Sequence, residues 1–449
     1  RCEAYLARAA QTPARSQVCH AQSSYHRLAP LLRGALGPTR YLFDLRSEPE
    51  VRRFVDRSDL AEVACRGPVT PDHVIRTKQV PLIVDTESPP SQASLRACVE
   101  AFRTRYRAYV QRMLELRRVT RTPLDPDPRV ALLPGIGLVG IGRTAKAARV
   151  AADLYTHTIS VIEAAQAIGS YQALPDEHIF DMEYWSLEQA KLGKKKPQAM
   201  AGTVVYVSGA ARGIGAATAK AFAQRGAQLF LVDRDGPAVK AVAEAIGAGW
   251  ATVDMCDAQQ VRQSVNQVVE RYGGLDGVVS NAGTAPQSPI DECSEEVLEH
   301  SLAINLKSHQ TLAAAATGVL KAQGHGGFLL FNVSKAALNP GKNFGPYAVA
   351  KAGLLALTKQ YALEGGPHGI RASAVNADRV RTGLLPADMV AARAKARGLD
   401  ADAYFRSNLL AREVAAEDVA QAFVFLAEAP STTGAVLTVD GGNVAASVR

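Results

Sequence analysis

Apolar and polar residues follow two different patterns along the chain, and the pattern changes near residue 200. In the first part, short apolar runs predict strands at 41–45, 80–84, 130–133 and 137–141, and 3.6-residue periodicity predicts helices at 48–63, 95–119 and 144–167. From residue 201 onward, near-continuous apolar runs alternate with helical patterns; the predicted strands are 203–208, 228–232, 277–280, 327–331, 371–375 and 435–439. Buried strands between helices predict an α/β fold, a doubly wound parallel sheet of Rossmann type covered on both faces. Such a sheet binds its ligand at the carboxyl ends of the strands.

The run from Leu192 to Pro197 is polar, lysine-rich and unfavourable for regular structure. We therefore predict a smaller α/β region over residues 1–192, a linker over 193–200 and a larger domain over 201–449. The chain begins at Arg1 rather than Met, so we expect a fragment whose natural N-terminus lies upstream.

Composition narrows the classes of function. The chain has 449 residues, 47% hydrophobic and 21% charged, with a formal net charge of +8. Its basic residues are spread out, which argues against nucleic-acid binding. No apolar stretch approaches the roughly 20 residues that span a bilayer. The six cysteines form no C-x-x-C pair, so we expect a reducing, cytoplasmic location without a disulfide framework or a structural zinc site.

A glycine-rich segment follows the strand predicted at 203–208 and opens the helix predicted at 214–225. It contains Gly209, Arg212, Gly213, Ile214 and Gly215. Glycines there allow a tight turn and a close approach of the backbone to a phosphate, and the helix N-terminus adds free N–H groups and positive dipole. The segment predicts a dinucleotide cofactor.

Polar residues at the ends of later strands predict the rest of this cofactor site. Asp233 lies 24 residues after Gly209, where a carboxylate can accept hydrogen bonds from ribose hydroxyls and repel a 2′-phosphate. This favours NAD over NADP, although the adjacent Arg234 could balance a phosphate. Asp254 is a candidate contact for the adenine amine, with a helix N-cap as the alternative. Small residues at the end of a further strand, Asn281, Ala282 and Gly283, let the cofactor pass close to the backbone.

The candidate chemistry is proton transfer by a tyrosine. Tyr347 and Lys351 are four residues apart and share one helix face, and Ser334 ends a strand. Hydride transfer at a carbonyl carbon needs a proton donor or acceptor at the oxygen, and a free phenol with a pKa of about 10 does this poorly. A nearby ammonium stabilises the phenolate. Ser334 can hydrogen-bond the substrate oxygen, and Asn305 can hold a water that relays the proton through Lys351.

Taken together, these motifs resemble those of the short-chain dehydrogenase/reductase family across residues 201–449. The match extends to Thr438, Asp440 and Gly442 near the C-terminus. The resemblance implies catalytic roles for Ser334, Tyr347, Lys351 and Asn305, contacts of Tyr347 and Lys351 with the cofactor, and a homodimer or homotetramer. It also implies an oxidoreductase for a small alcohol or aldehyde.

One segment departs from the family pattern. Where the family has a Pro-Gly turn, this chain reads from Asn376 to Thr382 without either residue. Asp378, Arg379 and Arg381 fall where nicotinamide and substrate meet. An arginine there could bind a carboxylate or phosphate, and a structural ion pair with Asp378 is the alternative.

The first region resembles class II sugar aldolases around residues 132–138. The position where those metal-dependent enzymes have a histidine before a glycine is here Ile136. The chain contains no His-x-His pair, and a catalytic zinc site needs about three protein ligands. His73 and His157 are possible lone ligands, with structural roles as the alternative. We therefore predict no bound metal in this chain.

The whole chain resembles the fused rhamnulose-1-phosphate aldolase/short-chain dehydrogenase proteins of rhamnose metabolism, on residues 70–78, 180–190 and 344–351. The resemblance implies an aldolase region that lacks its upstream part and a dehydrogenase acting on an aldehyde such as lactaldehyde. Three alternatives stay open: a 3-oxoacyl carrier or other carbonyl reductase, a working lyase in the full-length protein, and an N-terminal half that serves only in assembly.

Overall fold

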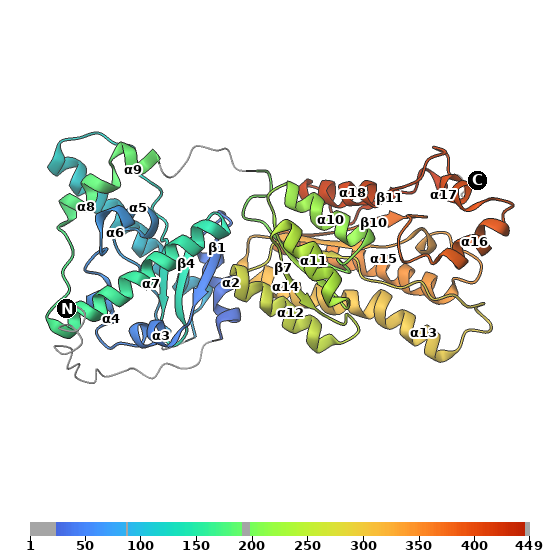
Figure 1. Cartoon of the computed structure of the whole chain (residues 1–449), viewed down its shortest axis with the longest axis horizontal. Helices are drawn as coiled ribbons and strands as arrows, with labels where there is room; N and C mark the ends of the chain where they lie inside the picture. The colour runs from blue at the N-terminus through green and yellow to red at the C-terminus, as the bar shows by residue number, and fades with distance from the viewer. Residues whose placement is uncertain (1–23, 87–88, 191–197, 445–449) are drawn as a thin grey trace. The chain divides into compact units, whose positions relative to one another are not determined.

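A computed structural model describes residues 24–86, 89–190 and 198–444 (Figure 1). The chain divides into two compact units, residues 1–197 with 270–273 and residues 198–269 with 274–449. The predicted linker falls largely on residues 191–197, which lie outside the described residues, so its bounds stay a prediction.

The first unit is built on a four-stranded mixed sheet in the order β1-β4-β3-β2. Strands β1 and β3 pair antiparallel with β4, and β2 pairs parallel with β3. The strands are β1 (Leu42–Arg46), β2 (Leu82–Ile83), β3 (Val130–Leu133) and β4 (Gly137–Gly142). The helices are α2 (Tyr25–Ala35), α3 (Pro49–Val55), α4 (Leu60–Ala64), η1 (Pro71–His73), α5 (Val74–Thr77), α6 (Gln92–Arg117), α7 (Ala145–Ile168), α8 (Asp176–Glu183) and α9 (Ser186–Ala190). The long helix α7 packs its apolar face against β4 and β1.

The single helix predicted over 48–63 is wrong, because the chain forms α3 and α4 with a turn between them. Two polar side chains in the turn are used elsewhere in this unit. The Asp56 carboxylate accepts a 2.6 Å hydrogen bond from the Gly135 amide, and the buried Arg57 guanidinium pairs with Asp59 and Glu163. These tertiary contacts stabilise the turn at residues 56–59, so the helical periodicity of 48–63 does not produce one continuous helix.

The second unit contains a seven-stranded sheet in the order β11-β10-β9-β8-β5-β6-β7, in which all neighbouring strands run parallel. This confirms the predicted doubly wound α/β fold. The strands are β5 (Val204–Ser208), β6 (Gln228–Asp233), β7 (Gly249–Thr252), β8 (Gly277–Ser280), β9 (Gly327–Asn332), β10 (Ile370–Ala377) and β11 (Val436–Val439). Strands β5 and β8 are buried along their whole length, as their uninterrupted apolar runs predict.

Helices cover both faces of this sheet (Figure 1). Helices α10, α11 and α18 pack on one face and α12, α14 and α15 on the other. The helices of this unit are α10 (Gly213–Gln224), α11 (Gly236–Ile246), α12 (Ala258–Tyr272), α13 (Glu295–Leu302), η2 (Ala303–Lys307), α14 (Ser308–Gln323), η3 (Lys335–Ala337), α15 (Gly345–Gly365), η4 (Gly366–His368), α16 (Ala387–Lys395), α17 (Ala401–Arg406) and α18 (Ala416–Glu428).

The strand order reverses beside β5. The chain runs outward from β5 through β6 to β7 and then returns to place β8 on the other side of β5. A crevice opens at the carboxyl ends of strands at such a reversal. Across the described parts of the chain, no helix combines the length and apolarity that a membrane span requires.

Candidate active site

The loop between β5 and α10 lies at this reversal and lines a cavity of about 310 Å³. Gly209 has a φ of +63° in the left-handed region, and a Cβ on it would lie 2.8 Å from the Cα of Ala282. A Cβ on Gly215 would lie 2.0 Å from the carbonyl oxygen of Gly209. These positions therefore require glycine, because any side chain would push the turn open.

Asn281, at the end of β8, holds this loop in place. Its side-chain amide donates to the carbonyl oxygens of Ser208 and Gly209, at 3.1 Å each, and its Oδ1 accepts a 2.7 Å bond from Asn332. The amide therefore connects three strand ends and fixes the floor of the cavity. Ala282 and Gly283 follow it along the lining.

Asp233 ends β6 and lines the same cavity. One carboxylate oxygen accepts a 3.1 Å bond from the amide of Ala211 and the other a 3.1 Å bond from the amide of Asp235. Arg212, the N-cap of α10, is paired with Asp235. Its charge is therefore neutralised locally, and both Arg212 and Arg234 line the cavity.

Asp254 lies apart from the lining of this cavity. Its side chain is exposed and accepts a 2.9 Å bond from the amide of Cys256, while the neighbouring Asp257 accepts from the first amides of α12. Asp254 therefore stabilises a turn, and its contact with adenine stays a prediction.

Tyr347 and Lys351 line the far end of the cavity, and Ser334 lies beside Tyr347, within hydrogen-bonding distance of its hydroxyl. Ser334 caps η3, accepting a 3.2 Å bond from the amide of Ala336, while the other two lie on the first turns of α15. The nitrogen of Lys351 lies 5.8 Å from the ring centre of Tyr347 and donates a 2.8 Å bond to the carbonyl oxygen of Asn332. The structure thus brings together the three residues that the sequence predicts.

Burial shifts the pKa values of both titratable groups on α15. It raises the pKa of Tyr347 to about 12, against the lowering effect of a hydrogen bond from Ser334, and Asp378 adds to the rise. It lowers the pKa of Lys351 to about 7. Both shifts disfavour the charged form, as desolvation does. At neutral pH the Tyr347 phenol is therefore protonated and Lys351 is only partly charged, and a nearby opposite charge would favour the ionised form of either group.

Asn305 lies in η2, a single π-helical turn of the kind found often at functional sites. Its Oδ1 accepts a 3.2 Å bond from the amide of Thr284. A Cβ on Gly283 would lie 2.8 Å from Asn305 Oδ1 and 3.7 Å from Lys351 Nζ. Asn305 and Lys351 therefore face the same small space beside Gly283.

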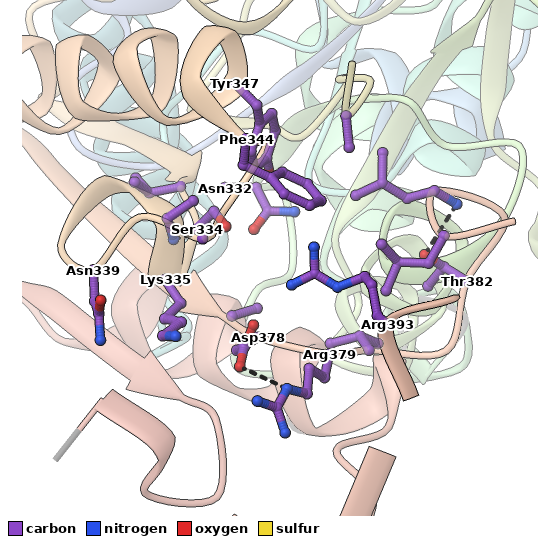
Figure 2. Close-up of a pocket in the computed structure, with 18 of the residues that line it drawn as sticks. Asn332, Ser334, Lys335, Asn339, Phe344, Tyr347, Asp378, Arg379, Thr382 and Arg393 are labelled. Atoms are coloured by element: carbon purple, nitrogen blue, oxygen red, sulfur yellow. Dashed lines mark hydrogen bonds and ion pairs between the residues drawn. The ribbon is translucent and has the colours of Figure 1, made fainter. Parts of the chain in front are cut away.

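A second cavity of about 120 Å³ shares Tyr347 with the first and contains Ser334 (Figure 2). The segment that departs from the family pattern forms part of its wall. Arg379 has a φ of +49° and donates to the backbone oxygens of Ser407 and Tyr404 at 2.8 and 3.3 Å, with Asp378 3.5 Å away. Arg381 pairs outside with Asp402 and Glu413. Arg379 therefore makes the structural ion pair with Asp378, whereas Arg381 forms its ion pairs with two other carboxylates.

These residues fit a nicotinamide dinucleotide. The left-handed glycines leave backbone uncovered at a helix N-terminus, the place for a pyrophosphate. Asp233 retains lone pairs for ribose hydroxyls, and the cavity reaches from there to Tyr347 and Lys351.

The first unit places His73 and His157 near each other, with ring centres 6.4 Å apart. Burial lowers the pKa of His73, with His157 also acting to lower it and Asp72 to raise it. Ile136 is buried in the turn between β3 and β4. Among the described residues, no three His, Cys, Asp or Glu side chains gather in a way that could hold a metal ion.

Sequence reasoning missed two residues of the site. The Asn332 carbonyl accepts a hydrogen bond from Lys351, and its side chain donates one to Asn281. Its position at a strand end, two residues before Ser334, could have identified it as a site residue. Arg393, on α16, points into the second cavity (Figure 2). No motif marks it, since it comes from a helix outside the core of the sheet.

Comparison with known proteins agrees with this geometry. Residues 209–443 match the family model described as enoyl-(acyl carrier protein) reductase, and residues 23–192 match the model for the second domain of class II aldolases. An uncharacterized oxidoreductase of Bacillus subtilis (strain 168), YuxG, is 32% identical over 94% of this chain, and the chain spans 64% of that protein's length. L-rhamnose 1-dehydrogenase (NAD(P)(+)) of Sphingomonas sp. (strain SKA58) is 35% identical over 54% of this chain and 96% of its own.

Solved structures resemble the second unit. Carveol dehydrogenase from Mycobacterium avium, in complex with NAD, has a TM-score of 0.52 at 27% identity, covering 55% of this chain and 99% of that one. The 3-ketoacyl-(acyl-carrier-protein) reductase from Brucella melitensis, complexed with NADH, has a TM-score of 0.50 at 27% identity over 54% and 98%. The first unit contains a class II aldolase-type region. Because the second unit combines a parallel sheet and a glycine loop with these matches, the chain belongs to the short-chain dehydrogenase/reductase family of oxidoreductases.

Proposed function

We propose that the second unit is an NAD-dependent dehydrogenase that interconverts a small hydroxy compound and the corresponding carbonyl compound. The observation that supports this most strongly is the position of Tyr347 and Lys351 at one end of a cavity lined at its other end by Gly209 and Asp233, with Ser334 hydrogen-bonded to Tyr347. When bound, the nicotinamide accepts or supplies the hydride.

The chain's own residues handle the oxygen and the proton. Ser334 donates a hydrogen bond to the substrate oxygen, and Tyr347 gives a proton to that oxygen during reduction or takes it during oxidation. A phenolate at Tyr347 favours the ammonium form of Lys351, whose nitrogen lies 5.8 Å from the ring centre. Asn305 faces Lys351 across Gly283 and orders the path by which the proton leaves for solvent.

NAD is the proposed cofactor because Asp233 presents a carboxylate where the adenosine ribose would lie. The pairing of Arg212 with Asp235 supports this choice, since it removes one cation that could hold a 2′-phosphate. The remaining parts of the dinucleotide would bind to the glycine loop, to the segment from Asn281 to Gly283 and to the first backbone amides of α10.

For the first unit we propose no aldolase activity in this chain. The absence of a His-x-His pair from the sequence and the burial of Ile136 support this proposal. An active class II lyase in the full-length protein, whose product the dehydrogenase would then use, would be consistent with the match of residues 23–192 to the second domain of class II aldolases.

A substrate panel tests the dehydrogenase proposal. The purified chain is mixed with NAD or NADP and with small alcohols, or with the reduced cofactors and aldehydes headed by lactaldehyde, and the absorbance of the reduced nicotinamide is followed. We expect turnover with NAD that exceeds turnover with NADP. Failure of both cofactors to bind would contradict the proposal.

A further inference from the structure

Arg393 reaches into the second cavity from α16, beside the proposed reaction centre (Figure 2). Its Nε donates a 2.8 Å hydrogen bond to the hydroxyl of Tyr404, and its guanidinium carbon lies 4.5 Å from the ring centre of Phe344. The ring and the phenol therefore fix the direction of the guanidinium. Among the described residues, no carboxylate lies within ion-pair distance of it.

The charges of this cavity do not balance. Its lining contains four cationic side chains, Lys335, Arg379, Arg393 and Arg397, and one carboxylate, Asp378. Asp378 is already engaged by Arg379 and by the side-chain amide of Asn443. Because Asp378 is already paired, the other three cations, Lys335, Arg393 and Arg397, have no carboxylate partner among the described residues.

The unbalanced charge lies close to the place where chemistry would occur. The ring of Phe344 packs edge-on against Tyr347 with centres 5.9 Å apart, and the same ring contacts Arg393. Lys335 follows Ser334 directly and lines the same space. A small molecule with its reacting oxygen at Ser334 and Tyr347 would thus have its other end near these cations.

We propose that Arg393, supported by Lys335, binds an anionic group of the substrate, so that the preferred substrates are hydroxy or carbonyl compounds bearing a carboxylate or a phosphate. A guanidinium held by Nε still offers its two outer nitrogens, and this fork matches both anions. Partial burial strengthens the interaction relative to a fully exposed pair. The proposal rests on the proposed dehydrogenase function and adds the class of substrate to it.

The test compares matched substrates on wild type and on Arg393→Met, which keeps an apolar stem against Phe344 and removes the charge. The pairs are glycerol with glycerol 3-phosphate, and 2-butanol with 3-hydroxybutyrate. We expect wild type to favour at least one anionic partner, and the variant to lose about 10- to 100-fold in kcat/KM on it, the range for one charged hydrogen-bonded contact. The variant's activity on the neutral partners should change by less than about twofold.

Arg412→Met is the matched control, since Arg412 is exposed, pairs with Asp418 and lies outside both cavities. It should leave both members of each pair unchanged. An equal loss on neutral and anionic partners in Arg393→Met would overturn the proposal and make Arg393 a structural residue.

A binding measurement separates this proposal from the proposed function. Malonate and inorganic phosphate are titrated into the complex of wild type with NADH, and the melting temperature is recorded. We expect at least one of the two anions to raise the melting temperature of wild type. This increase should be absent in Arg393→Met and present in Arg412→Met. Which anion acts distinguishes a carboxylate from a phosphate. NADH binding without any anion effect would refute the anion site alone, and absent NADH binding would refute the dehydrogenase proposal.

Discussion

The side-chain nitrogen of Lys351 donates a 2.8 Å hydrogen bond to the backbone carbonyl of Asn332. This contact connects helix α15 to the end of β9, where the Asn332 side chain also donates a 2.7 Å hydrogen bond to Asn281. One residue therefore positions both the proposed proton-transfer pair and the floor of the cofactor cavity. The amine is buried with no carboxylate among the causes that shift its pKa.

Stability should depend on this buried amine. Its pKa is about 7 in the folded protein against an ordinary value of 10.5, so between these values the unfolded chain binds a proton that the folded chain does not. The stability contributed by Lys351 therefore rises with pH in this window, by up to about 1.4 kcal/mol per pH unit, and is constant below it. Denaturant unfolding of wild type and Lys351→Met at several pH values measures the difference. Parallel profiles would show that the amine titrates as in solvent.

The pH dependence of turnover follows from Tyr347. Its pKa of about 12 in the unliganded protein leaves the phenol protonated at neutral pH. Carbonyl reduction, which needs the proton, should therefore proceed near pH 7, and kcat/KM for alcohol oxidation should rise with pH by up to roughly tenfold per unit. Initial rates in both directions across this range provide the check. An oxidation rate that falls with rising pH would exclude Tyr347 as the base.

Cofactor preference should depend on Asp233. Asp233→Ala removes the carboxylate proposed to accept from the ribose, so NAD binding should weaken and the preference over NADP should narrow. Titration of NADH and NADPH by fluorescence measures both affinities. Asp291→Ala, at an exposed position outside the cavity, is the control. Unchanged affinities in Asp233→Ala would remove Asp233 from the cofactor site.

Much of this site was predictable because its residues end strands of one parallel sheet. The glycine loop, Asp233, Asn281 and Ser334 follow apolar runs, and the topology brings such ends together. The pair on α15 has helical spacing. Arg393 was not predictable, because α16 lies in the long connection between β10 and β11, whose placement depends on tertiary contacts such as the bonds from Arg379 to Ser407.

In the first unit the sequence predicted the strands better than the helices. The hairpin of β3 and β4 followed from two apolar runs around a Pro-Gly turn. The break between α3 and α4 did not, since it depends on the contact of Asp56 with Gly135, far away in sequence. Periodicity alone cannot reveal a polar side chain that finds a distant partner.

The chain should show no aldolase activity by itself. A class II aldolase stabilises its enediolate with a divalent metal held by several ligands. Here His73 and His157 are neighbours without a third candidate ligand among the described residues. Retro-aldol cleavage of rhamnulose 1-phosphate with added zinc, alongside metal analysis after dialysis, is the measurement. Cleavage that tracks bound metal would mean that the ligand set is present.

The central claim is that Tyr347 transfers the proton in a nicotinamide-dependent oxidoreduction, and Tyr347→Phe tests it most directly. The substitution keeps the ring that packs against Phe344 and removes the hydroxyl. Steady-state turnover with NAD and the best substrate of the panel should fall by at least roughly 10²-fold, while NADH binding stays within about twofold of wild type. A Tyr347→Phe protein that binds NADH and turns over at a near wild-type rate would contradict the account.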